Sequence, residues 1–97
     1  MRNVESIKGV LLQHKAELRK KFKVKTIGVF GSYIRGEQKR SSDVDVLVEF
    51  EEPIGLFEFM DLEDYLSQLL GVKVDLVSKK ALKPHIGERI MQEVIMI

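Results

Sequence analysis

The chain has 97 residues, of which 44% are hydrophobic and 32% are charged, and its formal net charge is +1. A chain of this length forms one domain around a modest core, so we expect a single domain over residues 1–97. The near-neutral charge argues against a strongly basic nucleic-acid-binding protein, and we expect no direct nucleic-acid binding. The absence of cysteine excludes disulfides and thiolate metal sites.

No apolar signal region and no run of apolar residues long enough to cross a membrane is visible in the sequence. We therefore expect a cytoplasmic protein without a membrane-spanning segment.

The first expected elements are a helix and a strand. Asn3 or Ser6 is placed to cap a helix at its N-terminus. Apolar residues then recur at helical intervals, which predicts a helix that ends near Lys21 or Phe22. A strand is expected over about residues 25–30, followed by a loop over residues 31–42.

A second strand is predicted over residues 43–50 because apolar and polar residues alternate there. Val44, Val46 and Val48 face one way, and the opposite side carries Asp43, Asp45, Leu47 and Glu49. One face of this strand therefore belongs to the core, and the other carries two aspartates. Proline at position 53 ends the strand, because proline cannot continue a ladder of hydrogen bonds.

The remaining elements are two helices separated by a strand. A helix is expected over residues 56–70, with Gly71 as its C-terminal stop. Alternation predicts a half-buried strand over residues 72–77. Pro84 fits the first turn of a helix over residues 84–93. The apolar tail, residues 94–97, fits either a final helical turn or a short strand.

Two aspartates at the start of the second strand are the first candidate functional residues. Asp43 and Asp45 lie two positions apart, so both carboxylates point to the same side of the strand. Like charges this close repel each other unless a cation lies between them. Hard oxygen ligands suit Mg²⁺, which proteins commonly hold with one or two carboxylates and substrate phosphate oxygens.

The turn that precedes these aspartates fits the same chemistry. Gly31 allows close approach of the backbone to a ligand, and Ser32 offers a hydroxyl and an N–H group to phosphate. Arg35 is a candidate for a charge-assisted contact with phosphate. The turn differs from a P-loop, because no Gly-Lys-Ser/Thr follows it, and from the dinucleotide fingerprint Gly-x-Gly-x-x-Gly.

Together these motifs resemble the minimal nucleotidyltransferases of the DNA polymerase beta-like nucleotidyltransferase superfamily. The matching segments are Gly31-Ser32, Arg35-Gly36-Glu37, Ser42-Asp43-Val44-Asp45 and the strand that follows. The resemblance covers nearly the whole chain. It implies an α+β fold of the polymerase beta-like palm type: a small mixed sheet with helices packed on one face and the carboxylates on the exposed face.

The resemblance also implies a third catalytic aspartate, which we place at Asp75 because it lies in a similar Val-Asp-Leu-Val setting. Asp43, Asp45 and Asp75 are then both the catalytic residues and the metal ligands, with two Mg²⁺ ions expected. Gly31, Ser32 and Arg35 are expected to bind the phosphates of ATP. The implied reaction transfers AMP to an acceptor and releases pyrophosphate.

The family suggests what accepts the AMP. Minimal nucleotidyltransferases of this size are commonly antitoxins of a helical HEPN-domain RNase toxin, to which they attach AMP at a tyrosine. We therefore expect a hetero-oligomer with a HEPN toxin. Two alternatives stay open: neutralisation of the toxin by binding alone, and transfer of AMP to a small-molecule hydroxyl.

Three site residues also have structural interpretations. Arg35 fits phosphate binding and an ion pair with Glu37 that shapes the loop equally well. Asp75 is alternatively an edge-strand carboxylate paired with a lysine, Lys73 or Lys25. Tyr33, beside the turn, is a candidate for stacking on a nucleotide base.

Overall fold

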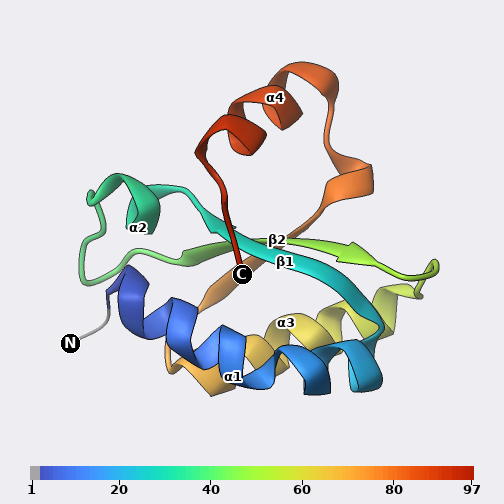
Figure 1. Ribbon diagram of the computed structural model, residues 1–97. Helices are drawn as coiled ribbons and strands as arrows, with labels where there is room; N and C mark the ends of the chain where they lie inside the picture. The colour runs from blue at the N-terminus through green and yellow to red at the C-terminus, as the bar shows by residue number, and fades with distance from the viewer. Residues whose placement is uncertain (1–2) are drawn as a thin grey trace.

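The computed structural model describes residues 3–97 and consists of short strands alternating with helices (Figure 1). In chain order the elements are α1 (Val4–Phe22), β1 (Val24–Phe30), α2 (Ser32–Arg35), β2 (Val44–Phe50), α3 (Leu56–Leu70), β3 (Val74–Ser78), the 3₁₀ turn η1 (Lys79–Ala81), α4 (Pro84–Glu93) and β4 (Ile95–Met96).

The four strands form one mixed sheet in the order β3-β2-β1-β4. β1 pairs antiparallel with both β2 and β4, whereas β2 and β3 run parallel. A parallel pair needs a crossover connection, and α3 supplies it. Because β2 and β3 are parallel and in register, Asp45 lies opposite Asp75 in the ladder.

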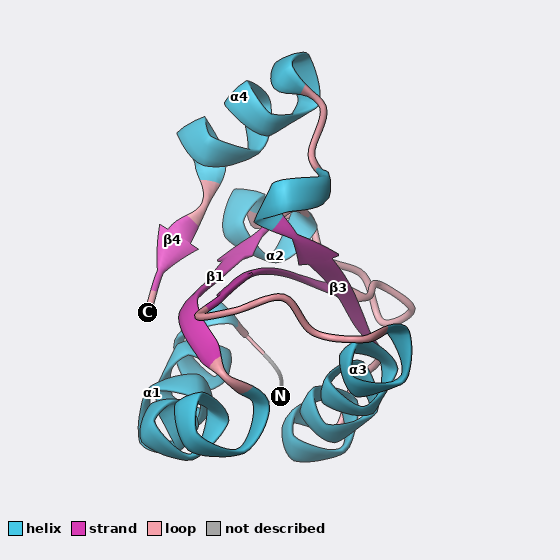
Figure 2. Cartoon of the chain, turned by 90° about the vertical axis from the view of Figure 1, so that its right-hand side faces the viewer, coloured by secondary structure: helices cyan, strands magenta, loops and turns pink. Residues whose placement is uncertain are grey.

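The two long helices, α1 and α3, cover one face of the sheet, and α4 lies on the other side (Figures 1 and 2). The core lies between α1, α3 and the sheet, and its fully buried members include Leu11, Val46 and Leu66, each 0% exposed. Burial of each such side chain stabilises the fold by about 1.5–3 kcal/mol. The predicted α+β architecture with a small mixed sheet is confirmed; the expected packing of helices on one face holds for α1 and α3, whereas α4 lies over the opposite face.

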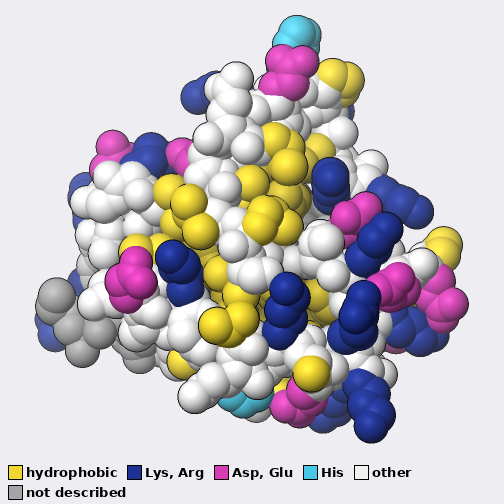
Figure 3. All heavy atoms as spheres, viewed as in Figure 1, with side chains coloured by type: hydrophobic (Ala, Val, Ile, Leu, Met, Phe, Trp, Pro, Cys, Tyr) yellow, Lys and Arg dark blue, Asp and Glu magenta, His cyan; other side chains and the backbone are white. Residues whose placement is uncertain are grey.

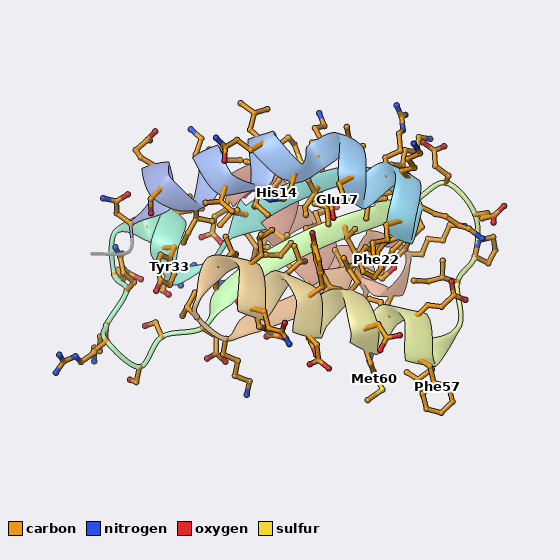
Figure 4. The ribbon with its side chains drawn as sticks, turned by 90° about the horizontal axis from the view of Figure 1, so that it is seen from below. His14, Glu17, Phe22, Tyr33, Phe57 and Met60 are labelled. Carbon is orange, nitrogen blue, oxygen red and sulfur yellow. The ribbon has the colours of Figure 1, made fainter. Side chains whose placement is uncertain are left out.

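Side-chain contacts join α1 to α3, and the two helices lie side by side in Figure 4. The hydroxyl of Tyr65 donates a hydrogen bond to Glu17 at 2.8 Å, and the Tyr65 ring lies 5.2 Å from that of Phe22. On the outer side of α3, Phe57 and Met60 point away from the protein, and Phe57 is 80% exposed.

The ends of the helices follow from local sequence. Asn3 caps α1, accepting a hydrogen bond from the Ser6 N–H at 2.9 Å, and the Ser6 hydroxyl completes a capping box. Gly71 ends α3 in the left-handed conformation, with φ of 68°. Pro84 begins α4, as its fixed φ and missing N–H favour.

A close backbone approach holds the C-terminal strand to the sheet. Gly28 pairs with Met96, and a β-carbon at position 28 would collide with the side chains of Val94 and Met96. The tail is therefore a short strand, which is one of the two structures that the sequence allowed. The Ile97 N–H extends this pairing by donating to the Ile27 carbonyl at 2.9 Å.

Most expected elements occur where the sequence placed them. The helices over residues 56–70 and 84–93 have the predicted bounds, and the strands differ by one or two residues. The expected loop over residues 31–42 contains the short helix α2, which was not predicted. Within residues 3–97, no helix combines the length and the apolar character that a membrane span requires.

Candidate active site

The carboxylate pair at the centre of the site comes from the parallel strands β2 and β3. Asp45 and Asp75 are register partners, and adjacent strands lie only about 4.8 Å apart. The neighbours of Asp45 on β2, Val44 and Val46, point into the core, so the Asp45 carboxylate faces the opposite side of the sheet. Asp75 is exposed on the edge strand, and Asp45 is half-buried.

Asp43 lies just before β2, and a tight turn leads into it. The Lys39 N–H donates to the Ser42 hydroxyl at 2.7 Å, and the Ser42 N–H donates to the Lys39 carbonyl at 3.0 Å. The Val44 N–H then donates to the Lys73 carbonyl at 2.9 Å, which starts the pairing with the β3 segment. Asp43 therefore enters the sheet two positions before Asp45, on the same side.

The electrostatics of the site centre on Asp45. Burial raises the pKa of its carboxyl to about 6, and the negative charges of Asp75 and Asp43 add to the increase, while Arg35 opposes it. The carboxylates therefore repel one another in the free protein, and a cation near Asp45 would relieve that repulsion.

A left-handed turn places the first residue of the Gly-Ser motif against this carboxylate. Phe30 pairs with Asp45 in the ladder, so Gly31 follows directly beside it. Gly31 has φ of 84°, and its α-carbon is so close to the carboxylate that a β-carbon would overlap the Asp45 Oδ2 atom. The Gly31 carbonyl then accepts from the Ile34 N–H at 3.0 Å, and α2 begins at Ser32.

Arg35, at the end of α2, is held by two carboxylates. Its Nε donates to Glu37 Oε1 at 2.7 Å, and its Nη1 donates to Glu93 Oε1 at 2.6 Å. The hydrogen bonds to Glu37 and to Glu93 raise the pKa of Arg35 above its ordinary value. The ion pair with Glu37 that the sequence suggested is therefore present, and the role of Arg35 in phosphate binding stays a prediction.

Glu93, the last residue of α4, is the site residue that sequence reasoning missed. Its Oε2 accepts a hydrogen bond from the Gly31 N–H at 2.7 Å, in addition to the contact with Arg35. Burial alone would raise the pKa of Glu93, but the hydrogen bonds from Arg35 and Gly31 outweigh this, and the pKa lies below its ordinary value. Glu93 and Gly31 are some sixty positions apart in the chain, so no local sequence pattern predicts their contact.

A pocket lies between this turn and α4. Phe30, Gly31 and Asp45 line it on the side of the sheet, and Ile86, Arg89 and Glu93 line it on the side of the helix. On the face of the molecule that Figure 3 shows, apolar side chains gather in the middle, between α4 and α1. The pocket is thus lined by four charged side chains together with the apolar side chains of Phe30, Ile86 and Ile90; the charged ones are Arg35, Asp45, Arg89 and Glu93.

Two further suggestions from the sequence, for Tyr33 and for an ion pair of Asp75, are not observed in the structure. Tyr33 is 5% exposed and belongs to the core, so the suggestion that it stacks on a nucleotide base is wrong: its ring is buried and not available to a ligand. The ion pairs among residues 3–97 do not include Asp75, and its pairing with Lys73 or Lys25 is not observed there.

The donor set fits Mg²⁺ in its chemistry. Within the described residues, no three acidic or histidine side chains lie close enough together to enclose a metal ion by themselves. Mg²⁺ does not need such a cage, because it commonly binds one or two carboxylates and completes its shell with water and substrate phosphate. Burial raises the pKa of Asp45, the charges of Asp75 and Asp43 add to the rise, and a cation beside this carboxylate would relieve their repulsion.

Comparisons with known proteins agree with this geometry. The family model described as "Nucleotidyltransferase domain" matches residues 11–97. The protein adenylyltransferase MntA of Thermococcus cleftensis is 52% identical over 97 residues, which cover 100% of this chain and 98% of the relative. A solved minimal nucleotidyltransferase is 36% identical, with a TM-score of 0.75 over 92% of this chain and 93% of the other.

Two more distant structures share the fold. A toxin–antitoxin with AMP-PNP is 24% identical and has a TM-score of 0.72, covering 87% of this chain and 69% of the other. A chain from the complex of a tri-AMPylated HEPN toxin of Shewanella oneidensis with an MNT antitoxin is 18% identical and has a TM-score of 0.67. The match covers 93% of this chain and 70% of the other. From the family match and its relatives, the chain belongs to the nucleotidyltransferase domain family and is a minimal nucleotidyltransferase.

Proposed function

We propose that the chain is a Mg²⁺-dependent protein adenylyltransferase that transfers AMP from ATP to a hydroxyl group of a partner protein. One observation carries this proposal: the Gly31 turn lies against the Asp45 carboxylate, and Asp45 pairs in register with Asp75. A turn suited to phosphate and a pair of carboxylates suited to Mg²⁺ meet there within one small site.

The turn and its arginine would bind the phosphates of ATP. The N–H of Gly31 points into the pocket, where it already donates to a carboxylate oxygen. Ser32 adds a hydroxyl next to it, and the Arg35 guanidinium offers charge-assisted hydrogen bonds. Together these groups would hold the phosphate chain so that the α-phosphorus faces the aspartates.

One or two carboxylates from the set Asp43, Asp45 and Asp75 would hold each Mg²⁺, with water and phosphate oxygens completing the shell. When bound, the ion supplies charge neutralisation of the pyrophosphate leaving group and activation of the acceptor hydroxyl. The acceptor oxygen forms a bond to the α-phosphorus as the bond to pyrophosphate breaks. Asp75 receives the proton of the hydroxyl, because it is exposed at the sheet edge, where an acceptor can reach it.

We further propose that the acceptor is a tyrosine of a HEPN-domain toxin and that the chain is the antitoxin. The names of two similar proteins support this: a relative is called protein adenylyltransferase MntA, and a structural neighbour is an MNT antitoxin with a tri-AMPylated HEPN toxin. The open, exposed position of Asp75 suits a macromolecular acceptor, because the site is accessible from outside the sheet.

The test is to incubate the purified chain with α-labelled ATP and Mg²⁺ and to offer different acceptors. These are the product of the neighbouring gene, a panel of small-molecule alcohols, and no acceptor. We expect the label on the partner protein and not on the small-molecule alcohols. Peptide mapping should then place the label on a tyrosine of the partner. Label on a small molecule would support the small-molecule alternative. A tight complex without label would support neutralisation by binding.

A further inference from the structure

The side chain of Glu93 makes a two-point contact with the candidate phosphate-binding groups. Its Oε2 accepts from the Gly31 N–H at 2.7 Å, and its Oε1 accepts from Arg35 Nη1 at 2.6 Å. Both distances are those of strong, charge-assisted hydrogen bonds. The Glu93 side chain is 22% exposed, so the carboxylate lies mostly within the protein, at the wall of the pocket.

The same two donors are those that the proposed function assigns to the nucleotide. A carboxylate and a phosphate each present negatively charged oxygens to N–H donors, and both favour the same geometry. The Gly31 N–H has a single hydrogen to donate, so it cannot bind both acceptors strongly. In addition, a triphosphate placed here would be repelled by the Glu93 charge, as Asp45 already is.

The helix that carries Glu93 is loosely attached. None of the side chains of α4, all of which lie in the described part of the chain, is fully buried. Ile86 is 54% and Met91 is 43% exposed. Figures 1 and 2 show α4 standing off the sheet on the side opposite α1 and α3; residues 82–83 lead into it from η1, and Val94 alone joins it to β4. Few packing contacts would therefore oppose its movement.

We infer that Glu93 is an internal competitor of the nucleotide, occupying the position of a phosphate so that ATP binds only when Glu93 leaves the Gly31 turn. This inference rests on the proposed function, because it needs the turn to bind phosphate. In the free protein Glu93 satisfies the Gly31 N–H and neutralises Arg35, and nucleotide binding exchanges one anion for another.

Equilibrium binding of the Mg²⁺ complex of α,β-methylene-ATP tests this, because that analogue cannot transfer AMP. Isothermal titration calorimetry would compare the wild type with Glu93→Gln, Glu93→Ala and the control Glu88→Gln. Glu88 is an exposed glutamate on the same helix, so its substitution removes the same charge without touching the turn. Circular dichroism would verify that each variant is folded.

We expect both Glu93 variants to bind the analogue about tenfold more tightly, since they lose a charge-assisted competitor, and Glu88→Gln to bind like the wild type. Weaker binding by the Glu93 variants would show that Glu93 supports the nucleotide site and would overturn the inference. Equal binding by all four proteins would also overturn it. Binding by none of them would instead contradict the proposed function and the inference with it.

Discussion

The α-carbon of Gly31 lies against the carboxylate of Asp45, and no space for a β-carbon remains between them. The register of the sheet causes this contact, because Phe30 pairs with Asp45 and the chain turns immediately afterwards. Gly31 also has φ of 84°, which residues with a side chain rarely adopt. Glycine is therefore required here both by the conformation of the turn and by the position of the aspartate.

Substitution of Gly31 should show both requirements. We expect Gly31→Ala to lower the free energy of unfolding by about 1–3 kcal/mol and to abolish AMP transfer, because the turn must move away from Asp45. The matched control is Gly36→Ala, which has φ of 71° but open space around its α-carbon. Urea unfolding and a transfer assay would compare them. Equal losses in the two variants would show that backbone strain alone matters.

Asp45→Asn should stabilise the free protein although it removes activity. The folded-state pKa of Asp45 is raised from 3.8 to about 6 by burial and by Asp75 and Asp43. The protonated form is therefore favoured in the folded state, and stability falls as the pH rises from about 4 through about 6. A neutral asparagine avoids this loss, which we put at about 1–2 kcal/mol near neutral pH after allowing for solvent screening.

Urea unfolding of both proteins at several pH values would test that expectation. The variant should be the more stable one near neutral pH, and the difference should vanish at about pH 4, where Asp45 is protonated. A variant that is less stable than the wild type near neutral pH would mean that Asp45 makes favourable contacts in its ionised form.

Asp75→Asn should remove catalysis while the fold is kept. Asp75 is exposed at the edge of the sheet, and so its substitution disturbs little packing. Loss of a group that binds metal and receives a proton should lower kcat by about 10²-fold or more. Asp64→Asn is the control, since Asp64 is an exposed aspartate of α3. Wild-type kcat in Asp75→Asn would remove Asp75 from the mechanism.

The core prediction concerns Leu66, which is 0% exposed between α3 and the sheet. We expect Leu66→Ala to cost about 2–5 kcal/mol of stability through the lost burial and the cavity that remains. Leu12 on α1 is 63% exposed, and Leu12→Ala should cost much less. Thermal or urea unfolding would measure both changes. Similar costs would contradict the assignment of Leu66 to the core.

Much of the fold could be read from local sequence signals. The periodicity of α1 with its Asn3 cap, and the bounds of α3 between Leu56 and Gly71, are local properties of the chain. The short helix α2 was not predicted, because four residues are too few to show a helical period. The tail was ambiguous, because its pairing with Gly28 is set by a distant strand.

The candidate site was predicted only as far as it is local. Asp43 directly precedes β2 and Asp45 lies within it, so the alternation expected of a strand was enough to predict both on one side. Asp45 lies opposite Asp75 because β2 and β3 are parallel and in this register. The sequence does not show that register, and Asp75 was predicted from the family resemblance instead. Glu93 reaches the Gly31 turn from the last turn of α4, and no pattern in the sequence marks such a contact.

AMP transfer to a partner protein is tested most directly by the intact mass of that partner after incubation with ATP, Mg²⁺ and the chain. We expect a mass increase of one or more AMP units on a HEPN-domain partner with the wild-type chain, and no increase with folded Asp45→Asn. An unmodified partner in both reactions, although the two proteins form a complex, would contradict a transferase role. A full increase with Asp45→Asn would contradict the assignment of Asp45 to the reaction.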